Sequence, residues 1–460
     1  MKKVRGATRG RWKWGVGAGL ALLVLAAAVF GLRGLRPTVA GLSAPRPALA
    51  LTALSADPVP SAGPSPVDYA RLDERIRTLM QEPDMVGFAI ATVEKGQVRF
   101  VKTYGEVLAG SGVPVTPDTV FRWGSVSKGV AAALVTKLAE SGKLSLDAPV
   151  ARFNTTLRLP GDARNVTIAD ILSHRTGLVR NAWDDRLEAG EDPKLLRGEM
   201  ATLAPLCPPS TCYAYQNIAF DTASEIVETV TRSRYAAVAR DKLFQPLGMT
   251  GASVGQAGLE TAPSWARPHH LGRVPAKVNG IYYRVPAAAG VNSSIRDLVR
   301  WMRAQMGDAP TILSPAALET MHRPRVSTPP HGPLSAMDKA LKKPSYGLAW
   351  RSFDYAGHHL VGHRGTVDGY GSLVTFDPVD RSGIVMLWNS NWYRAARLQL
   401  EFFDMLYGLP ATDWLDLPLR AGRNGADGVS RYPGPAADRS TGARNPASRA
   451  APAKAKSASR

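Results

Sequence analysis

Cysteine is scarce in this sequence, whose 460 residues contain only Cys207 and Cys212. Two cysteines exclude a small scaffold that several disulfides hold together, because cysteine is abundant in such scaffolds. Neither cysteine has a cysteine or histidine neighbour at the spacing of a zinc site, so we predict no metal and no cofactor. The pair flanks Pro208-Pro209, and we expect it to form a disulfide in an oxidising compartment.

Acidic residues are absent from one end of the chain and rare at the other. Residues 1–36 hold eight Lys or Arg and no acid, and residues 421–460 hold eight against two Asp. Subtracting +8 and +6 for the two ends from the formal net charge of +19 leaves +5 for residues 37–420. No basic stripe interleaved with aromatic residues crosses that body, so we predict no nucleic-acid partner.

Charged residues are also absent from Trp14 to Leu32, a mostly apolar run that is long enough to cross a bilayer. Six basic residues precede this run, and only Arg33 and Arg36 follow it closely. By the positive-inside rule, residues 1–36 form a cytoplasmic stub and a single-pass inner-membrane anchor, with the body in the periplasm. The alternative is a cleaved signal peptide, with Ala48-Leu49-Ala50 as a cleavage site, which would release the body into the periplasm.

Composition divides the rest of the chain into three parts. Residues 37–66 are rich in Ala, Pro, Ser and Leu, which suits a flexible linker. Residues 67–410 carry the periodic apolar patterns of a folded domain. Residues 421–460 combine Ala, Arg, Gly, Pro and Ser without periodicity, and we expect a disordered basic tail there.

Apolar periodicity in the body predicts an α+β fold, an antiparallel sheet flanked by helices with a large, mostly helical insertion. The pattern is a hairpin, a long helical and irregular region, and then a run of short strands without βαβ alternation. We predict helices at 68–81, 126–140, 217–231, 294–306 and 393–407 and strands at 85–93, 98–104, 346–350, 359–362, 371–376 and 383–389.

The most informative local feature is Ser125-x-x-Lys128 at the start of an expected helix. Residues three apart share one helix face, so the Lys128 amine can reach the proton of the Ser125 hydroxyl. At the first turn, unpaired backbone N–H groups also favour developing negative charge. We therefore predict Ser125 as the nucleophile. Ser253 fits the Gly-x-Ser-x-Gly pattern, but no long apolar strand precedes it as that motif requires.

Tyr215-Gln216-Asn217 supplies a second pair of candidate residues. A tyrosine beside a nucleophile can relay a proton between serine, lysine and leaving group if nearby cations lower its pKa from about 10. The Asn217 amide has both a donor and an acceptor, which suits a substrate amide and the lysine. The alternative is a loop tyrosine followed by an asparagine that caps the next helix.

A third motif is Gly362-His363-Arg364-Gly365-Thr366 at the end of an expected strand. Glycines allow close approach of a ligand to the backbone, and an edge strand here would pair with an extended substrate. We expect the N–H groups of Ser125 and Thr366 to form an oxyanion hole. The alternative is a glycine-rich hairpin with a surface histidine.

In this order, Ser125-x-x-Lys128, Tyr215-x-Asn217 and His363-x-Gly365 resemble the three active-site motifs of the serine β-lactamase and penicillin-binding-protein superfamily, on its class C side. The resemblance spans residues 67–410 and includes Leu144–Val150, Ile171–Leu178 and Pro246–Thr250. It implies that Ser125 is acylated, that Lys128 and Tyr215 share proton transfer, and that Asn217, His363, Gly365 and Thr366 bind substrate. His174, within these phrases, is expected to be a buried, hydrogen-bonded loop residue.

The third motif departs from the family pattern, since class C enzymes usually carry Lys-Thr-Gly where this chain has His363-Arg364-Gly365. A histidine loses its charge near pH 6.5, so His363 would be mostly uncharged at neutral pH and would hold a substrate carboxylate poorly. We predict a serine hydrolase acting on a β-lactam, a D-amino-acid peptide or an ester. The alternatives are a carboxylesterase of the same fold and a non-catalytic penicillin- or peptidoglycan-binding domain. The sequence gives no oligomeric state.

Overall fold

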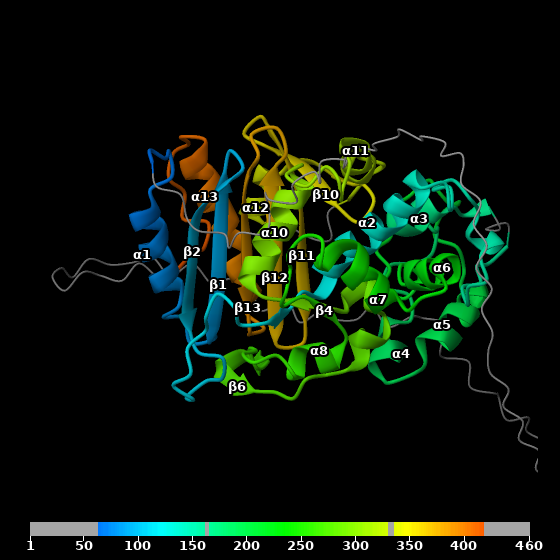
Figure 1. Ribbon diagram of the computed structural model, residues 1–460, viewed down its shortest axis with the longest axis horizontal. Coiled ribbons are helices and arrows are strands. Elements are labelled where there is room, and N and C mark those ends of the chain that lie inside the picture. The colour runs from blue at the N-terminus through cyan, green and yellow to red at the C-terminus, as the bar shows by residue number, and fades with distance from the viewer. Residues whose placement is uncertain (1–62, 162–164, 330–334, 418–460) are drawn as a thin grey trace, which may run out of the picture. The chain divides into compact units, whose positions relative to one another are not determined.

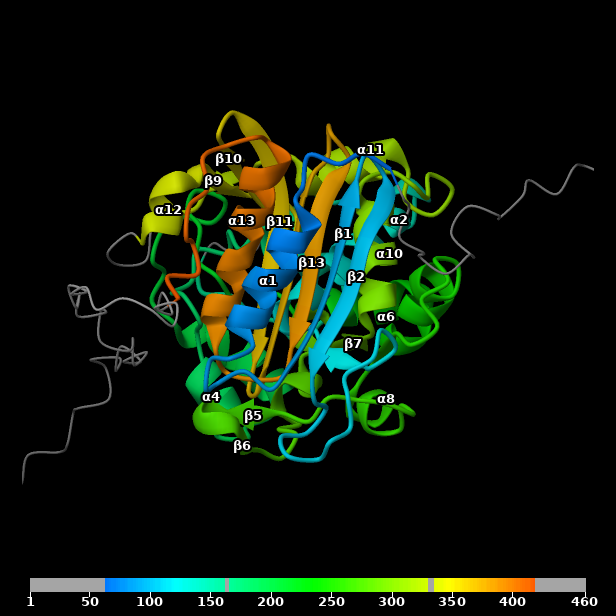
Figure 2. The ribbon, with the colours of Figure 1, turned by 90° about the vertical axis from the view of Figure 1, so that its left-hand side faces the viewer.

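The computed structural model describes residues 63–161, 165–329 and 335–417. The predicted membrane anchor, most of the linker and the basic tail lie outside these residues. Within the described ranges, no helix has both the length and the apolar character that crossing a membrane requires. The described part is an α+β structure, in which one large antiparallel sheet has helices on both faces (Figures 1 and 2).

The large sheet has eight strands in the described residues. The two strands that come first in the chain lie next to the strand that comes last in the chain. In spatial order the strands are β2 (Gln97–Gly105), β1 (Gly87–Glu94), β13 (Ser382–Trp388), β12 (Tyr370–Asp377), β11 (His358–Val367), β10 (Arg351–Tyr355), β9 (Lys342–Tyr346) and β8 (Val326–Ser327). The pairing of β1 with β13 brings the two ends of the domain together, since Phe88 lies opposite Trp388. Every residue of β1, β12 and β13 is buried, as expected for strands covered on both faces.

Helices α1 (Tyr69–Leu79) and α13 (Leu398–Leu406) cover one face of the sheet (Figure 2). They pack with sheet residues such as Phe88, Ile90 and Met386 in one apolar cluster. The other face carries α10 (Ile295–Gln305), which a capping box of Ser294 and Asp297 begins. Behind α10 lies α2 (Ser127–Glu140), which is buried nearly all round because small alanines let neighbouring helices approach it.

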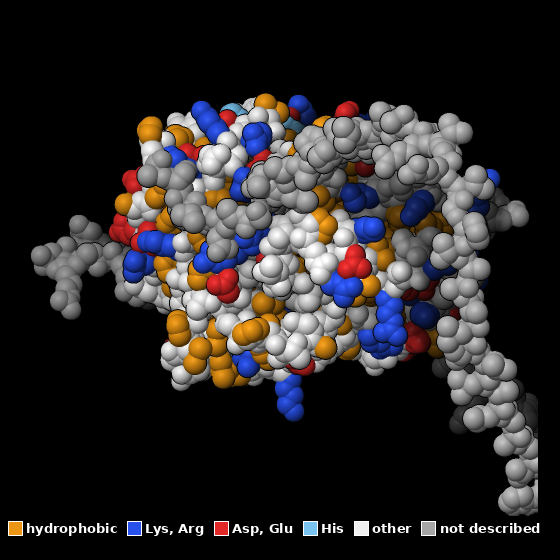
Figure 3. All heavy atoms as spheres, viewed as in Figure 1, with side chains coloured by type: hydrophobic (Ala, Val, Ile, Leu, Met, Phe, Trp, Pro, Cys, Tyr) orange, Lys and Arg blue, Asp and Glu red, His pale blue; other side chains and the backbone are white. Residues whose placement is uncertain are grey.

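The long insertion between β2 and β8 includes α2 and α10. Its other helices are α3 (Ile168–Leu172), α4 (Asp184–Glu188), α5 (Pro193–Glu199), α6 (Thr222–Thr231), α7 (Tyr235–Ala239), α8 (Gln256–Glu260), α9 (Pro286–Ala289) and α11 (Pro315–His322), and α12 (Ala336–Ala340) follows β8. Its short strands are β3 (Phe121–Arg122), β4 (Ser253–Val254), β5 (His269–His270), β6 (Val274–Pro275) and β7 (Val291–Ser293). Helices α3 to α7 form the helical part at the right of Figure 1, whereas α8 and β6 lie below the sheet. Lys and Arg side chains on the face drawn in Figure 3 are scattered among acidic and apolar ones.

The predicted strand at 346–350 is wrong. Only Tyr346 belongs to a strand, and the next four residues form the buried bend between β9 and β10. The N–H groups of Leu348 and Ala349 donate to carbonyls of α11 and α3 rather than to a strand, and Ala349 has a φ of 67°. The run is apolar because it is buried, and burial alone does not distinguish a strand from an irregular segment.

Candidate active site

The chain enters the candidate site through β3, which pairs with β7, and then turns sharply at Gly124. Gly124 has a φ of +50°, and a Cβ atom there would lie 2.8 Å from the Thr366 nitrogen of β11. The next turn, η1 (Gly124–Val126), is a 3₁₀ turn that runs directly into α2. Ser125 therefore lies in this 3₁₀ turn, two residues before the first residue of α2 and close to the predicted first helical turn.

Lys128 is completely buried one turn after Ser125. Its Nζ lies 2.8 Å from Asn217 Oδ1, 3.1 Å from the Ala288 carbonyl and 3.3 Å from Ser125 Oγ. Burial lowers the pKa of Lys128 to about 7, although the carboxylates of Asp184 and Asp221 oppose the shift. A lysine with this pKa is partly unprotonated at neutral pH and can act as a base.

The three acceptors around Nζ also indicate where a neutral amine presents its lone pair. Neutral Lys128 has two hydrogens, whereas the Asn217 and Ala288 oxygens can only accept. These two oxygens make the shorter contacts and take both hydrogens. The lone pair then faces Ser125 Oγ, as proton abstraction from that hydroxyl requires.

Tyr215 approaches the same hydroxyl from the loop before α6, and its Oη lies 2.8 Å from Ser125 Oγ. The Lys128 Nζ lies 4.7 Å from the centroid of the Tyr215 ring. A proton relay through this tyrosine was conditional on neighbouring cations that lower its pKa. Instead, burial raises the pKa of Tyr215 to about 12, despite the hydrogen bond from its hydroxyl to Ser125 and the charge of Arg351. Tyr215 is thus a neutral hydrogen-bond donor in the resting site.

Asn217 does not cap α6, which begins five residues later at Thr222 with Asp221 as its N-cap. The Asn217 Nδ2 donates to Asp184 Oδ2 at 2.8 Å, and this contact turns the Asn217 Oδ1 toward Lys128. Asp184 is a site residue that the sequence analysis missed. Its other oxygen, Oδ1, is buried and makes no hydrogen bond to any described residue. Burial raises the pKa of Asp184 to about 6, so at pH 7 it is mostly a carboxylate.

The His363 motif lies in β11, where residues 358–362 pair with β10 but residues 363–367 pair only with β12. That free edge faces η1, as an edge strand beside the nucleophile should. The His363 ring is placed to stay neutral. Only 5% of His363 is exposed, both ring nitrogens already have partners, and burial holds its pKa well below 6.5.

Gly365 and Thr366 lie against the nucleophile turn. A Cβ atom at Gly365 would meet the Trp123 carbonyl at 1.9 Å, so this glycine permits the strand to pack on the nucleophile segment. The sequence analysis attributed Gly365 to substrate approach, and the contact with Trp123 supplies a different reason. The Thr366 backbone abuts Gly124, the residue before Ser125, so the two N–H groups of the expected oxyanion hole belong to neighbouring segments.

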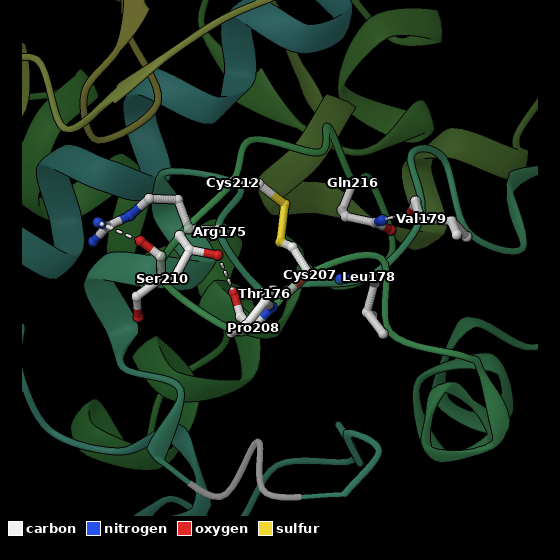
Figure 4. The surroundings of a disulfide bond; sticks show 10 residues. Arg175, Thr176, Leu178, Val179, Cys207, Pro208, Ser210, Cys212 and Gln216 are labelled. Atoms are coloured by element: carbon white, nitrogen blue, oxygen red, sulfur yellow. Dashed lines mark hydrogen bonds between the residues drawn. A yellow bond between two sulfur atoms is a disulfide. The ribbon is translucent and has the colours of Figure 1, made fainter.

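Cys207 and Cys212 form a disulfide in the loop that leads to Tyr215 (Figure 4). The N–H of Leu206 donates to the Gly177 carbonyl, and the N–H of Ser210 donates to that of Arg175. A Cβ atom at Gly177 would lie 2.5 Å from the Cys207 carbonyl oxygen. The bridged loop is therefore packed tightly on the segment after His174, which is itself in contact with Tyr215.

Comparisons with known proteins agree with this geometry. The Beta-lactamase family model matches residues 72–401. Unguisins hydrolase ungD' of Aspergillus campestris is 30% identical over 69% of this chain and 60% of its own length. Penicillin-binding protein 4 of Amycolatopsis lactamdurans is 30% identical over 75% of this chain and 90% of its own length. The octameric penicillin-binding protein homologue of Pyrococcus abyssi shares the fold, with 24% identity, a TM-score of 0.67 and coverage of 75% and 78% of the two chains.

The chain therefore belongs to the β-lactamase family of serine hydrolases and penicillin-binding proteins. It spans 60% of the length of the Aspergillus hydrolase, so that protein's activity is not transferred to it.

We predict that Asp184→Asn lowers the pH at which activity rises. The carboxylate of Asp184 raises the pKa of Lys128, and its removal lowers that pKa by about one unit while an amide still holds Asn217. The pH profile of kcat/KM on an ester substrate measures this shift. Asp185→Asn removes the neighbouring exposed carboxylate and is the matched control. If kcat/KM of Asp184→Asn rises at the same pH as in the parent chain, or at a higher pH, the role of Asp184 is contradicted.

We also predict that Gly365→Ala lowers the free energy of unfolding by about 3 kcal/mol, since its Cβ overlaps the Trp123 carbonyl. Gly198→Ala in α5 is the control, because a Cβ atom there meets nothing closer than 3.9 Å. Denaturant unfolding followed by circular dichroism compares the two variants. Equal stability of both would show that β11 does not pack on the nucleophile segment as described.

Proposed function

We propose that this chain is a serine acyl hydrolase that cleaves an amide, in a β-lactam or a D-amino-acid peptide, or an ester through an acyl-enzyme on Ser125. The observation that carries the proposal is that Lys128 and Tyr215 converge on one hydroxyl. The Ser125 Oγ lies 3.3 Å from the Lys128 Nζ and 2.8 Å from the Tyr215 Oη. A nucleophile with an adjacent base and a second proton donor is the arrangement that acyl transfer needs.

In the acylation step, neutral Lys128 takes the proton from Ser125 as Oγ attacks the carbonyl carbon. The oxyanion accepts hydrogen bonds from the Ser125 and Thr366 N–H groups. As the carbon–nitrogen or carbon–oxygen bond breaks, Tyr215 gives its proton to the leaving group and regains one from Lys128. In the deacylation step, neutral Lys128 takes a proton from a water as the water oxygen attacks the carbonyl carbon of the acyl-enzyme. The bond between that carbon and Ser125 Oγ then breaks, Lys128 returns the proton to Oγ, and the acid is released.

Arg351 supplies a cation at the site that sequence analysis missed. It lies in β10, its Nη2 donates to Tyr213 Oη at 3.1 Å, and its charge acts on Lys128, Tyr215 and His363. No carboxylate among the described residues pairs with it. We propose that Arg351 binds a substrate carboxylate, the part that the sequence analysis gave to His363. The relatives named for penicillin binding agree with such a substrate.

Two alternatives remain in the same fold: a carboxylesterase, whose substrate carries no carboxylate, and a binding domain without turnover. Repeated turnover of a chromogenic ester excludes the binding domain. A preference for neutral esters over carboxylate-bearing amides identifies the carboxylesterase.

We also propose that residues 1–36 anchor the chain in the inner membrane and that the catalytic domain faces the periplasm. The charge asymmetry around Trp14–Leu32 supports this orientation. The disulfide between Cys207 and Cys212 also suits an oxidising compartment.

Ser125→Ala should abolish covalent labelling by a fluorescent penicillin or a fluorophosphonate, because it removes the attacking oxygen. Gel fluorescence of the purified chain measures the label. Ser253→Ala, which removes the hydroxyl of the Gly-x-Ser-x-Gly pattern, should label like the parent protein. Labelling of a folded Ser125→Ala variant would rule out Ser125 as the nucleophile.

Arg351→Gln should slow acylation by a penicillin about 10- to 100-fold, which is the value of one charge-assisted hydrogen bond. Hydrolysis of an uncharged p-nitrophenyl ester should change by less than about threefold, since that substrate has no carboxylate to lose. Arg351→Lys keeps the charge, and its rate of acylation by the penicillin should lie between the rates of the parent chain and of Arg351→Gln. Equal losses on both substrates would assign Arg351 to general structure instead of carboxylate binding.

A further inference from the structure

A row of hydrogen bonds connects His174, Tyr346 and His363 behind the candidate site. The His174 Nε2 lies 3.2 Å from the Tyr346 Oη, which lies 3.0 Å from the His363 Nε2. His174 and Tyr346 have no exposed surface, and His363 is 5% exposed. The proposed acylation mechanism uses none of these three side chains.

Both ends of the row are fixed by backbone groups. At one end, the Gln216 N–H donates to the His174 Nδ1 at 3.2 Å, so that nitrogen carries no proton. At the other end, the His363 Nδ1 lies 2.6 Å from the Arg364 carbonyl, which can only accept, so that nitrogen must carry a proton. A backbone N–H and a carbonyl cannot exchange roles, and each end therefore has one state.

The two fixed ends determine which atom carries each proton along the row. Neutral His174 has its single proton on Nε2 and donates it to the Tyr346 oxygen. The Tyr346 hydroxyl then donates to the His363 Nε2, which is free to accept because the His363 proton is on Nδ1. An additional proton on His363 would put two N–H donors against one hydroxyl and leave the Tyr346 hydrogen without an acceptor. The row therefore satisfies all of its members only when both histidines are neutral.

We infer that His174, Tyr346 and His363 form a one-directional, neutral hydrogen-bond relay that positions Tyr215 and the free edge of β11. The His174 ring contacts the Tyr215 ring, with centroids 4.3 Å apart, and His363 is the first residue of that free edge. The relay thus connects the loop that carries the proton donor to the strand that carries Gly365 and Thr366. All three are positioning residues. This inference rests on the proposed function, since it assigns the purpose of the relay to the acylation of Ser125.

The charges around the relay agree with its neutrality. Lys128 of α2, Arg351 of β10 and Arg364 of β11 act on one or both histidines. The other titratable groups in contact are the tyrosines at 213, 215 and 346. These cations, together with burial, hold the pKa of His174 and of His363 well below 6.5. The resulting acyl hydrolase has no titrating histidine at its third motif.

Histidine tautomers in the unmodified 460-residue chain test the relay without substrate or turnover. Long-range ¹H–¹⁵N correlation spectra of ¹⁵N-histidine-labelled protein should show the Nε2–H form for His174 and the Nδ1–H form for His363. Both signals should stay neutral from pH 5 to 8, and spectra of His174→Gln and His363→Gln assign them. A His363 signal that titrates in this range, or its Nε2–H form, would overturn the relay. Because Ser125 labelling is measured separately, failure of the proposed function is distinguished from failure of the relay.

Tyr346→Phe tests whether the relay positions the reacting groups. The variant should keep His363 in its Nδ1–H form, because the Arg364 carbonyl still fixes that proton, but shift the ¹⁵N signal of His363 Nε2, which loses its donor. It should also reduce the acylation rate about tenfold, the value of one lost hydrogen bond. Tyr355→Phe is the matched control, because it removes another buried tyrosine hydroxyl, bonded to Asp404 in the apolar cluster on the opposite face of the sheet. The control should lose similar thermal stability and keep both the Nε2 signal of His363 and the rate. Retention of the parental Nε2 signal of His363 and of the parental rate in Tyr346→Phe would refute positioning.

Discussion

The candidate site depends on the burial of one amine. Lys128 lies inside the helix layer, on a helix whose other buried residues are mostly alanine, valine and leucine, and it has no exposed surface. Removing an ammonium from water is costly, so the neutral form becomes accessible near pH 7. Three groups contact the Lys128 Nζ, and each orients it. The Asn217 and Ala288 oxygens accept its two hydrogens, and its lone pair then points to the Ser125 hydroxyl. Asp184 in turn orients Asn217.

Sequence analysis found the residues whose chemistry is local to a motif and missed those that tertiary packing brings in. The spacing of Ser125 and Lys128 and the order of the later motifs predicted the cluster, and apolar periodicity predicted the α+β sheet. Asp184, Arg351 and Tyr346 lie in no recognisable pattern, and each acts through a partner distant in sequence. A contact with a residue distant in sequence produces no periodic pattern in the sequence, because only the folded chain brings the two residues together.

Burial is the physical reason why the structure departs from what the sequence suggested. An apolar run at 346–350 was assigned to a strand, whereas its residues are apolar because they fill the bend under α11 and α3. The proton relay by Tyr215 was conditional on neighbouring cations that lower its pKa, whereas desolvation is the larger effect and raises it. The same desolvation lowers the pKa of His363. Charge proximity can be guessed from a motif, but the cost of desolvation requires the packed structure.

The neutral His363 changes what the third motif means in this chain. A lysine in this position would bring a charge to β11, whereas here the charge is provided by Arg351, which pairs with Gly362 from the adjacent strand β10. The same residue pairs with Tyr346 of β9 on its other side, so the cation and the relay hydroxyl occupy neighbouring strands. A charged His363 would be a further cation acted on by Arg351, Lys128 and Arg364, and no carboxylate among the described residues forms an ion pair with it. The relay removes that conflict by keeping His363 neutral, which leaves Arg351 free to meet an anionic substrate.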